Sequence, residues 1–251
     1  MSTFTELPGW LTDSANWAGE SGIPARMFEH VWLSALAVCL AVLVALPLGL
    51  YIGHKRRHEF LVVTAANLGR AVPSYGILAI AFLVALAFGL GFTVLPIVVA
   101  LFFLSLPPIV TNTYVGVKNV DRDTVEAARG MGLNESQILR SVELPLAAPV
   151  IVTGLRTATV QTVATATLAA VIGGIGLGRY IIDGFAQGDR VQVLGGAVLV
   201  AILAIVTELA FGLLQRAVRP RTTRSDGRKS TATGFTEPGQ VGPAPQAGRA
   251  G

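Results

Sequence analysis

Long apolar runs separated by short charged stretches dominate this chain of 251 residues and restrict the folds open to it. Hydrophobic residues make up 52% of the sequence and charged residues only 14%, whereas soluble domains carry about 25% charged residues. An α-helix of about 20 apolar residues crosses the hydrocarbon core of a bilayer. We therefore expect an all-α integral membrane protein with five transmembrane helices, over about residues 30–53, 73–90, 97–117, 147–172 and 192–214.

Basic residues are distributed unevenly between the two sides of this predicted bundle. Fifteen of the 19 Lys and Arg residues fall on one side, three (Arg26, Arg179 and Arg190) fall on the other, and Arg156 lies within a span. Arg179 and Arg190 bound a predicted polar outer loop. Because cytoplasmic loops carry the excess of Lys and Arg, we expect the N-terminus outside and the C-terminus in the cytoplasm. Residues 1–29 are then an extracellular segment, either lying on the membrane surface or disordered, and residues 217–251 a disordered basic cytoplasmic tail.

Residues 121–145, DRDTVEAARGMGLNESQILRSVELP, carry charge between the third and fourth predicted spans. Asp123 lies three residues before Glu126, and Asn134 lies three residues before Gln137, which is the spacing of a helix N-cap with its reciprocal partner. The glycines between the two pairs can adopt the positive φ that ends a helix, and the Leu-Pro at the end is expected to close the unit. The stretch therefore predicts two short polar helices in a cytoplasmic helix-turn-helix.

The same stretch resembles the EAA loop of ABC-importer permeases. Glu126-Ala127-Ala128, Gly132 and Leu144-Pro145 stand at that motif's spacing, and Val142 replaces its isoleucine. In that family the loop is the coupling helix that docks into a cleft of a separate ATPase subunit. The resemblance implies that ATPase coupling involves Glu126, Ala127, Ala128, Gly132, Leu144 and Pro145. The alternative is an amphipathic turn that packs only on its own membrane domain.

Three further runs resemble the osmoprotectant branch of these permeases, which imports glycine betaine, choline, carnitine and related quaternary amines. They are AVPSYGILA (71–79), LPPIVTNTYVGVKNVD (106–121) and GLRTATVQTVATATLAAVIGGIGLG (154–178). The resemblance implies a type-1 permease domain over residues 30–216, with a methionine-type permease, which shares the five-span layout, as the alternative.

This resemblance also implies the partners and the location of the chain. They are an ATPase subunit that binds ATP, a second permease subunit of the same or a related sequence, and an extracellular substrate-binding protein, all at a bacterial inner membrane. No nucleic-acid partner is expected. A secondary carrier or channel that works without ATP, and a membrane scaffold without transport, are the alternatives from other classes.

The fourth predicted span is rich in threonine and ends in a glycine-rich break, residues 173–178. Hydroxyl groups at membrane depth belong either on a polar pathway or on a helix–helix seam, and threonine can also bond to its own backbone. We expect the break to be a flexible turn that lines a cavity. The candidate pathway residues are Thr159, Thr162, Gly174 and Gly176.

Two charged residues lie within the predicted spans, Arg156 in the fourth and Glu208 in the fifth. Charges at membrane depth are costly unless they are paired. At about 1.5 Å rise per residue, both lie about 12–14 Å from the cytoplasmic ends of their helices. The sequence therefore predicts an Arg156–Glu208 ion pair that holds these two spans together.

Small residues and prolines within the spans predict close helix contacts. Gly49 and Gly53 form a GxxxG pattern, a weak signal for close packing. Pro107 and Pro108 leave backbone groups unpaired, so they should face protein or a water-filled cavity.

We find no catalytic or metal-binding pattern in the sequence. A Gly-x-x-x-x-Gly-Lys-Ser/Thr phosphate loop is absent, so we expect a transport subunit without its own ATPase site or cofactor. His30, His54 and His58 flank the first predicted span at opposite ends and form no metal-ligand grouping with Cys39. His54 and His58 are expected to be basic anchors at the membrane surface.

Overall fold

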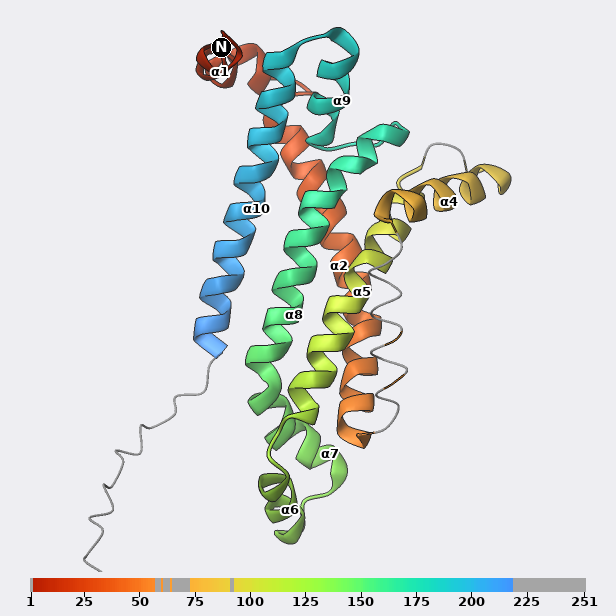
Figure 1. Cartoon of the computed structure of the whole chain (residues 1–251), viewed down its shortest axis with the longest axis vertical. Helices are drawn as coiled ribbons and strands as arrows, with labels where there is room; N and C mark the ends of the chain where they lie inside the picture. The colour runs from red at the N-terminus through yellow and green to blue at the C-terminus, as the bar shows by residue number, and fades with distance from the viewer. Residues whose placement is uncertain (1, 57–59, 61–63, 65–72, 91–92, 219–251) are drawn as a thin grey trace, which may run out of the picture. The chain divides into compact units, whose positions relative to one another are not determined.

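The computed structural model describes residues 2–56, 60, 64, 73–90 and 93–218, and every regular element in these ranges is a helix. Four helices are long and apolar enough to cross a membrane: α2 (Ile23–Lys55), α5 (Leu95–Lys118), α10 (Arg190–Val218), and the continuous stretch Glu135–Ile172 that contains α8 (Leu144–Thr165). They run alongside one another (Figure 1). The all-helical expectation is confirmed for the described residues.

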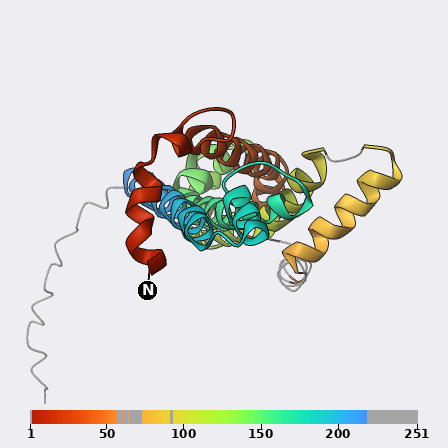
Figure 2. The same ribbon diagram turned by 90° about the horizontal axis from the view of Figure 1, so that it is seen from above.

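The second predicted span, residues 73–90, differs from the expectation. It forms α4 (Ser74–Ala87), an apolar helix of 14 residues. At about 1.5 Å per residue this helix is about 21 Å long, shorter than the roughly 30 Å hydrocarbon core. It runs crosswise to the long helices (Figures 1 and 2) and contacts α5. The residues just before it lie outside the described ranges, as does the predicted tail from residue 219 onward.

The α2–α5 interface is built on small residues. A Cβ atom on Gly49 would lie 2.6 Å from the Thr113 Cβ, and a Cβ atom on Gly53 would lie 2.8 Å from the Val117 Cβ. The two helices therefore approach so closely that neither glycine position has room for a side chain. The weak GxxxG signal thus marks a true contact.

Helix α5 also packs against α8 at the level of its proline pair. Pro107 and Pro108 are buried, as expected for residues that disturb the backbone hydrogen-bond ladder. The Asn112 Nδ2 donates to the carbonyl oxygen of Pro108 at 2.8 Å. A Cβ on Gly154 of α8 would lie 2.6 Å from the Asn112 Cβ, so this interface too depends on a glycine.

The described residues of the N-terminal segment are largely helical. It forms α1 (Ser2–Thr12) and a short 3₁₀ helix, η1 (Ser14–Trp17), before α2 begins at Ile23. Trp10 fills a notch on α10, where a Cβ on Gly195 would lie 2.4 Å from its ring. Figure 2 shows α1 beside the end of α10. The first long helix therefore begins seven residues before the predicted start at His30.

The predicted outer loop between Arg179 and Arg190 is in fact largely helical, as α9 (Gly178–Gln187). Tyr180 explains this, because its ring meets Trp10 edge to face with centroids 5.4 Å apart and its hydroxyl donates to the Ser21 carbonyl oxygen at 2.7 Å. Gly188, at φ 74°, ends the helix. A stretch that reads as polar in sequence is thus folded by tertiary contacts.

Candidate functional site: the hairpin between α5 and α8

The first helix of the hairpin, α6 (Arg122–Gly130), begins two positions earlier than predicted. Asp121 is its N-cap and accepts from the Asp123 backbone N–H at 2.9 Å. Asp123 lies in the first turn, where its charge favours the positive end of the helix dipole. The predicted Asp123–Glu126 capping box is therefore wrong, because Asp121 already occupies the cap.

The turn and the second helix follow the expectation. Gly132 adopts φ 88°, a conformation that favours glycine. Asn134 then caps α7 (Glu135–Ile138) in a complete capping box: its side chain accepts from the Gln137 N–H and the Gln137 side chain accepts from the Asn134 N–H, both at 2.9 Å. Arg129 and Glu135 also join the two helices by a pair of hydrogen bonds at 3.0 and 3.2 Å.

The hairpin has a small apolar core, and the residues of the Glu-Ala-Ala motif are either buried in it or exposed on the surface. Buried side chains hold the hairpin together: Val120, Val125, Ala128 and Ile138. Ala128 is 2% exposed, so it packs inside the hairpin and cannot contact another protein. Glu126 and Ala127 are exposed. They are the two residues of the motif that are free to meet a partner.

The sequence predicts that the hairpin closes at Leu144-Pro145, but the chain remains helical there. It continues into α8 through one turn of π-helix, η2 (Leu139–Glu143), in which the Leu144 N–H donates to the Leu139 carbonyl oxygen. Pro145 lies in the first turn of α8, where its missing N–H and fixed φ are tolerated. The wider π turn carries the helix past the proline. A stiff helical connection therefore joins the hairpin to α8.

His54, predicted to be a surface anchor, instead lies between two carboxylates. Its Nδ1 is 2.6 Å from Glu143 Oε2 and its Nε2 is 3.1 Å from Glu135 Oε2. The Glu143 side chain is 2% exposed and that of His54 is 9% exposed. This contact ties the end of α2 to the hairpin and to the π turn. Sequence reasoning missed it because the partners are separated by 89 residues.

Next to this contact the chain forms a polar hollow of about 310 Å³. Its lining is mainly basic: His54, Lys55, Arg56, Arg122 and Arg129, with Val125, Glu126 and Glu143. The Arg56 guanidinium also donates to the Val120 carbonyl oxygen at 3.0 Å. The exposed carboxylate of the motif, Glu126, thus lies at the edge of a positively charged surface.

Arg156 and Glu208 form an ion pair between α8 and α10. Gln215 completes the group, because its Oε1 accepts from Arg156 at 3.2 Å and its Nε2 donates to the Thr153 hydroxyl at 2.7 Å. Both charged side chains remain about a third exposed, at 32% and 41%. The contact between the two helices therefore agrees with the register estimated from sequence, while the part of Gln215 was not foreseen.

The candidate pathway threonines both bond to the backbone of their own helix, α8. Thr162 is buried, donates to the Ala158 carbonyl oxygen at 2.7 Å and lies 2.7 Å from the Ser105 hydroxyl on α5. Thr159 donates to the Leu155 carbonyl oxygen at 2.8 Å. Thr162 thus lies on the seam with α5, and Thr159 is half-buried with its hydroxyl bonded to its own helix.

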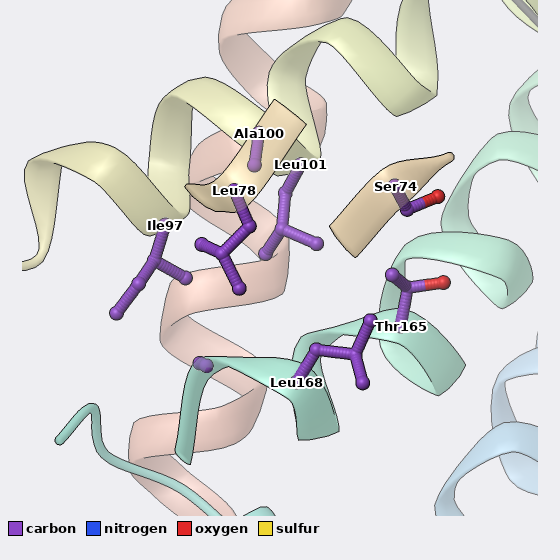
Figure 3. A pocket seen from close by; sticks show the side chains of 8 residues that line it. Ser74, Leu78, Ile97, Ala100, Leu101, Thr165 and Leu168 are labelled. Carbon is purple, nitrogen blue, oxygen red and sulfur yellow. The ribbon is translucent and has the colours of Figure 1, made fainter. Parts of the chain in front are cut away.

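A small cavity lies further along the same seam, beside Thr165 (Figure 3). Leu78, Leu101 and Leu168 surround it, and its volume is about 10 Å³. That is about the room of one water molecule, so the cavity cannot hold an organic amine in this conformation.

The glycine-rich break follows α8 through a 3₁₀ segment, η3 (Ala166–Ile172). Gly174 and Gly176, the other candidate pathway residues, pack against neighbouring chain. A Cβ on Gly174 would lie 2.4 Å from the Ala169 carbonyl oxygen, and one on Gly176 would lie 3.1 Å from His30 Nδ1.

Comparison with known proteins identifies the family of this all-helical architecture. The chain belongs to the family described as the binding-protein-dependent transport system inner membrane component, which matches residues 45–224. It is thus a permease subunit of an ABC importer, a membrane protein.

Several relatives are named for what they carry. The choline transport system permease protein OpuBB of Bacillus subtilis is 41% identical over 78% of this chain and 88% of its own length. The glycine betaine/carnitine/choline permease OpuCB of Bacillus subtilis is 40% identical over 77% and 87%. The osmoprotectant import permease OsmW of Salmonella typhimurium is 39% identical over 78% and 92%.

Among solved structures, an inward-facing form of the MetNI methionine ABC transporter superposes with a TM-score of 0.68. Sequence identity is 21%, and the superposition covers 79% of this chain and 96% of the other. This similarity shows a shared fold.

Proposed function

We propose that this permease subunit imports osmoprotectant quaternary amines, such as glycine betaine, choline or carnitine, at the expense of ATP hydrolysed by a separate subunit. The printed functions of the 39–41% identical relatives support this substrate class. The alternative substrate is methionine or another amino acid, since the chain shares the fold of the MetNI methionine transporter. The functional unit would hold two permease subunits, two ATPases and an extracellular binding protein.

In the membrane, the long helices would serve as spans with the hairpin on the cytoplasmic side. The asymmetry of Lys and Arg supports an N-terminus outside and a C-terminus inside. The second predicted span, residues 73–90, which contains α4, would supply the fifth crossing. The end of the bundle that carries α1 and α9, opposite the hairpin (Figure 1), would then face the binding protein.

The observation that carries the coupling proposal is the mechanical connection of the hairpin. Its exposed face, with Glu126 and Ala127, is available to an ATPase. Its body is joined to α8 by the π turn and to α2 by the contact of His54 with Glu143. A movement of the hairpin that follows ATP binding would therefore reach two long helices at once.

The charge of the hairpin also predicts the chemistry of the ATPase surface. The hollow beside Glu126 is lined by the basic side chains of Lys55, Arg56, Arg122 and Arg129. Electrostatic complementarity favours an acidic partner surface here. Reversing the charge of Arg122, which is exposed, should weaken ATPase association, and more so at low ionic strength because salt screens such contacts.

Transport itself is tested with the permease, its ATPase and its binding protein reconstituted in vesicles. We expect uptake of radiolabelled betaine, choline or carnitine that depends on ATP and on the binding protein. Substituting Glu126 together with Gly132 should abolish this uptake without loss of membrane insertion. Uptake without ATP would instead favour a secondary carrier, and uptake of methionine alone would correct the substrate.

A further inference from the structure

The glycine-rich turn at residues 173–178 is attached to the beginning of α2. The Gly176 backbone N–H donates to Glu29 Oε2 at 2.9 Å, across 147 residues of sequence. The same carboxylate oxygen lies 3.0 Å from Arg26 Nη1. Gly176 has φ 97° and is buried, so this hydrogen bond fixes a backbone conformation that residues with a side chain rarely adopt.

His30 packs against the glycine turn at Gly176. It is 1% exposed, and its Nε2 lies 2.8 Å from the Val163 carbonyl oxygen on α8. Because a carbonyl only accepts, Nε2 carries the proton and Nδ1 is the bare acceptor. This Nδ1 points at Gly176, where a Cβ would lie 3.1 Å away, and it has no hydrogen-bond partner among the described residues.

Three pieces of chain therefore meet at one point: the first turns of α2, the place where α8 tightens into η3, and the glycine turn. The turn also folds back onto η3, since a Cβ on Gly178 would lie 2.3 Å from the Thr167 carbonyl oxygen. Gly176 and Gly178 have no side chain, which allows the turn to lie this close to α2 and η3. Two polar residues, Glu29 and His30, thus provide the specific attachment.

We propose that Glu29 and His30 form a latch that holds the glycine turn closed against α2, and that the transport cycle opens it. This inference rests on the proposed function for the identity of the cycle. The latch lies near the start of α2, about 36 Å along the helix from His54 at about 1.5 Å per residue. It is thus at the end of the bundle opposite the hairpin, where substrate would enter. Glu29 and His30 are positioning residues and need not touch the substrate.

The contacts at this point suit a reversible closure. An unpaired buried acceptor such as His30 Nδ1 is unfavourable in the closed form, and it could gain a partner once the turn moves away. Because the pair of Glu29 with Arg26 lies within the first turns of α2, it can persist when the turn moves away. Opening therefore exchanges one hydrogen bond for hydration and also displaces Leu177, a buried side chain of the turn that packs with Ile23 and Leu199.

The first test is hydrogen exchange of the full-length permease in lipid nanodiscs. We expect the amides of residues 173–178 to exchange at least tenfold faster in Glu29→Ala than in the unaltered chain. Glu29→Gln, which retains an acceptor oxygen, should restore most of the protection. Asp183→Asn is the matched control, because it removes an ion pair with Arg179 of 2.7 Å at the same end of the bundle and should leave the turn unchanged. Equal exchange in Glu29→Ala and the control would overturn the latch.

The second test measures the gate in the reconstituted importer. His30→Ala and Glu29→Ala should raise ATP hydrolysis without binding protein severalfold and lower the substrate imported per ATP, with Glu29→Gln close to normal. If exchange accelerates but hydrolysis and import stay at their normal ratio, the gating role is wrong. If the unaltered importer carries substrate without ATP, the proposed function fails while the exchange result still decides the latch.

Discussion

Removing His54 should be more damaging than its place at the end of a membrane helix suggests. Glu143, at 2% exposure, relies on His54 Nδ1 at 2.6 Å. Breaking a buried pair by deleting one partner costs about 3–5 kcal/mol, because the other charge stays buried and unpaired. For a chain of 150–250 residues, 1 kcal/mol shifts Tm by about 2–4 °C. His54→Ala should thus lower Tm by roughly 6 °C or more.

Thermal unfolding of the purified permease in detergent measures this shift, with two companion variants. Glu143→Gln keeps a hydrogen-bonding side chain and removes the buried charge, so its effect should be smaller. Glu135→Gln removes the outer partner of His54, which is 51% exposed, and should leave Tm nearly unchanged because exposed ion pairs contribute little. If His54→Ala melts at the same temperature as Glu135→Gln, the buried contact does not hold α2 to the hairpin.

Three further outcomes are expected. Gly49→Val should destabilise the α2–α5 interface by about 1–3 kcal/mol through overpacking, seen as a lower Tm, whereas Gly212→Val, where a Cβ meets nothing within 4 Å, should not. Exchanging the charges of Arg156 and Glu208 should restore uptake lost in either single substitution; no rescue would mean that the pair is not functionally required. Asn134→Ala should weaken the hairpin by about 1 kcal/mol through loss of its N-cap, measured as faster hydrogen exchange over α7 and unchanged exchange at the opposite end.

The sequence predicted the features that depend on local physics. Apolar length located the four long helices, and the spacing of Asn134 and Gln137 predicted a capping box that the structure contains. The register of Arg156 and Glu208 could be estimated because helical rise converts residue number into depth. In each case the information lay within one helix or at one helix end.

The features that sequence reasoning missed depend on contacts between distant segments. His54 reads as one more basic residue in a basic cluster, and only the fold brings it to Glu143. The sequence gives His30 no partner, whereas in the fold it forms a hydrogen bond to the Val163 carbonyl oxygen across 133 residues. The polar stretch around Tyr180 became a helix because Trp10 packs on it. Neither periodicity nor composition encodes such pairings.

The coupling role of the hairpin is tested most directly by photo-cross-linking in native membranes. A photoreactive amino acid at Ala127, which is exposed on α6, should cross-link to the ATPase subunit. The same probe at Phe185, which is 71% exposed at the other end of the bundle, should not. Equal cross-linking at the two positions, or none at Ala127 in a complex that carries substrate, would contradict the account.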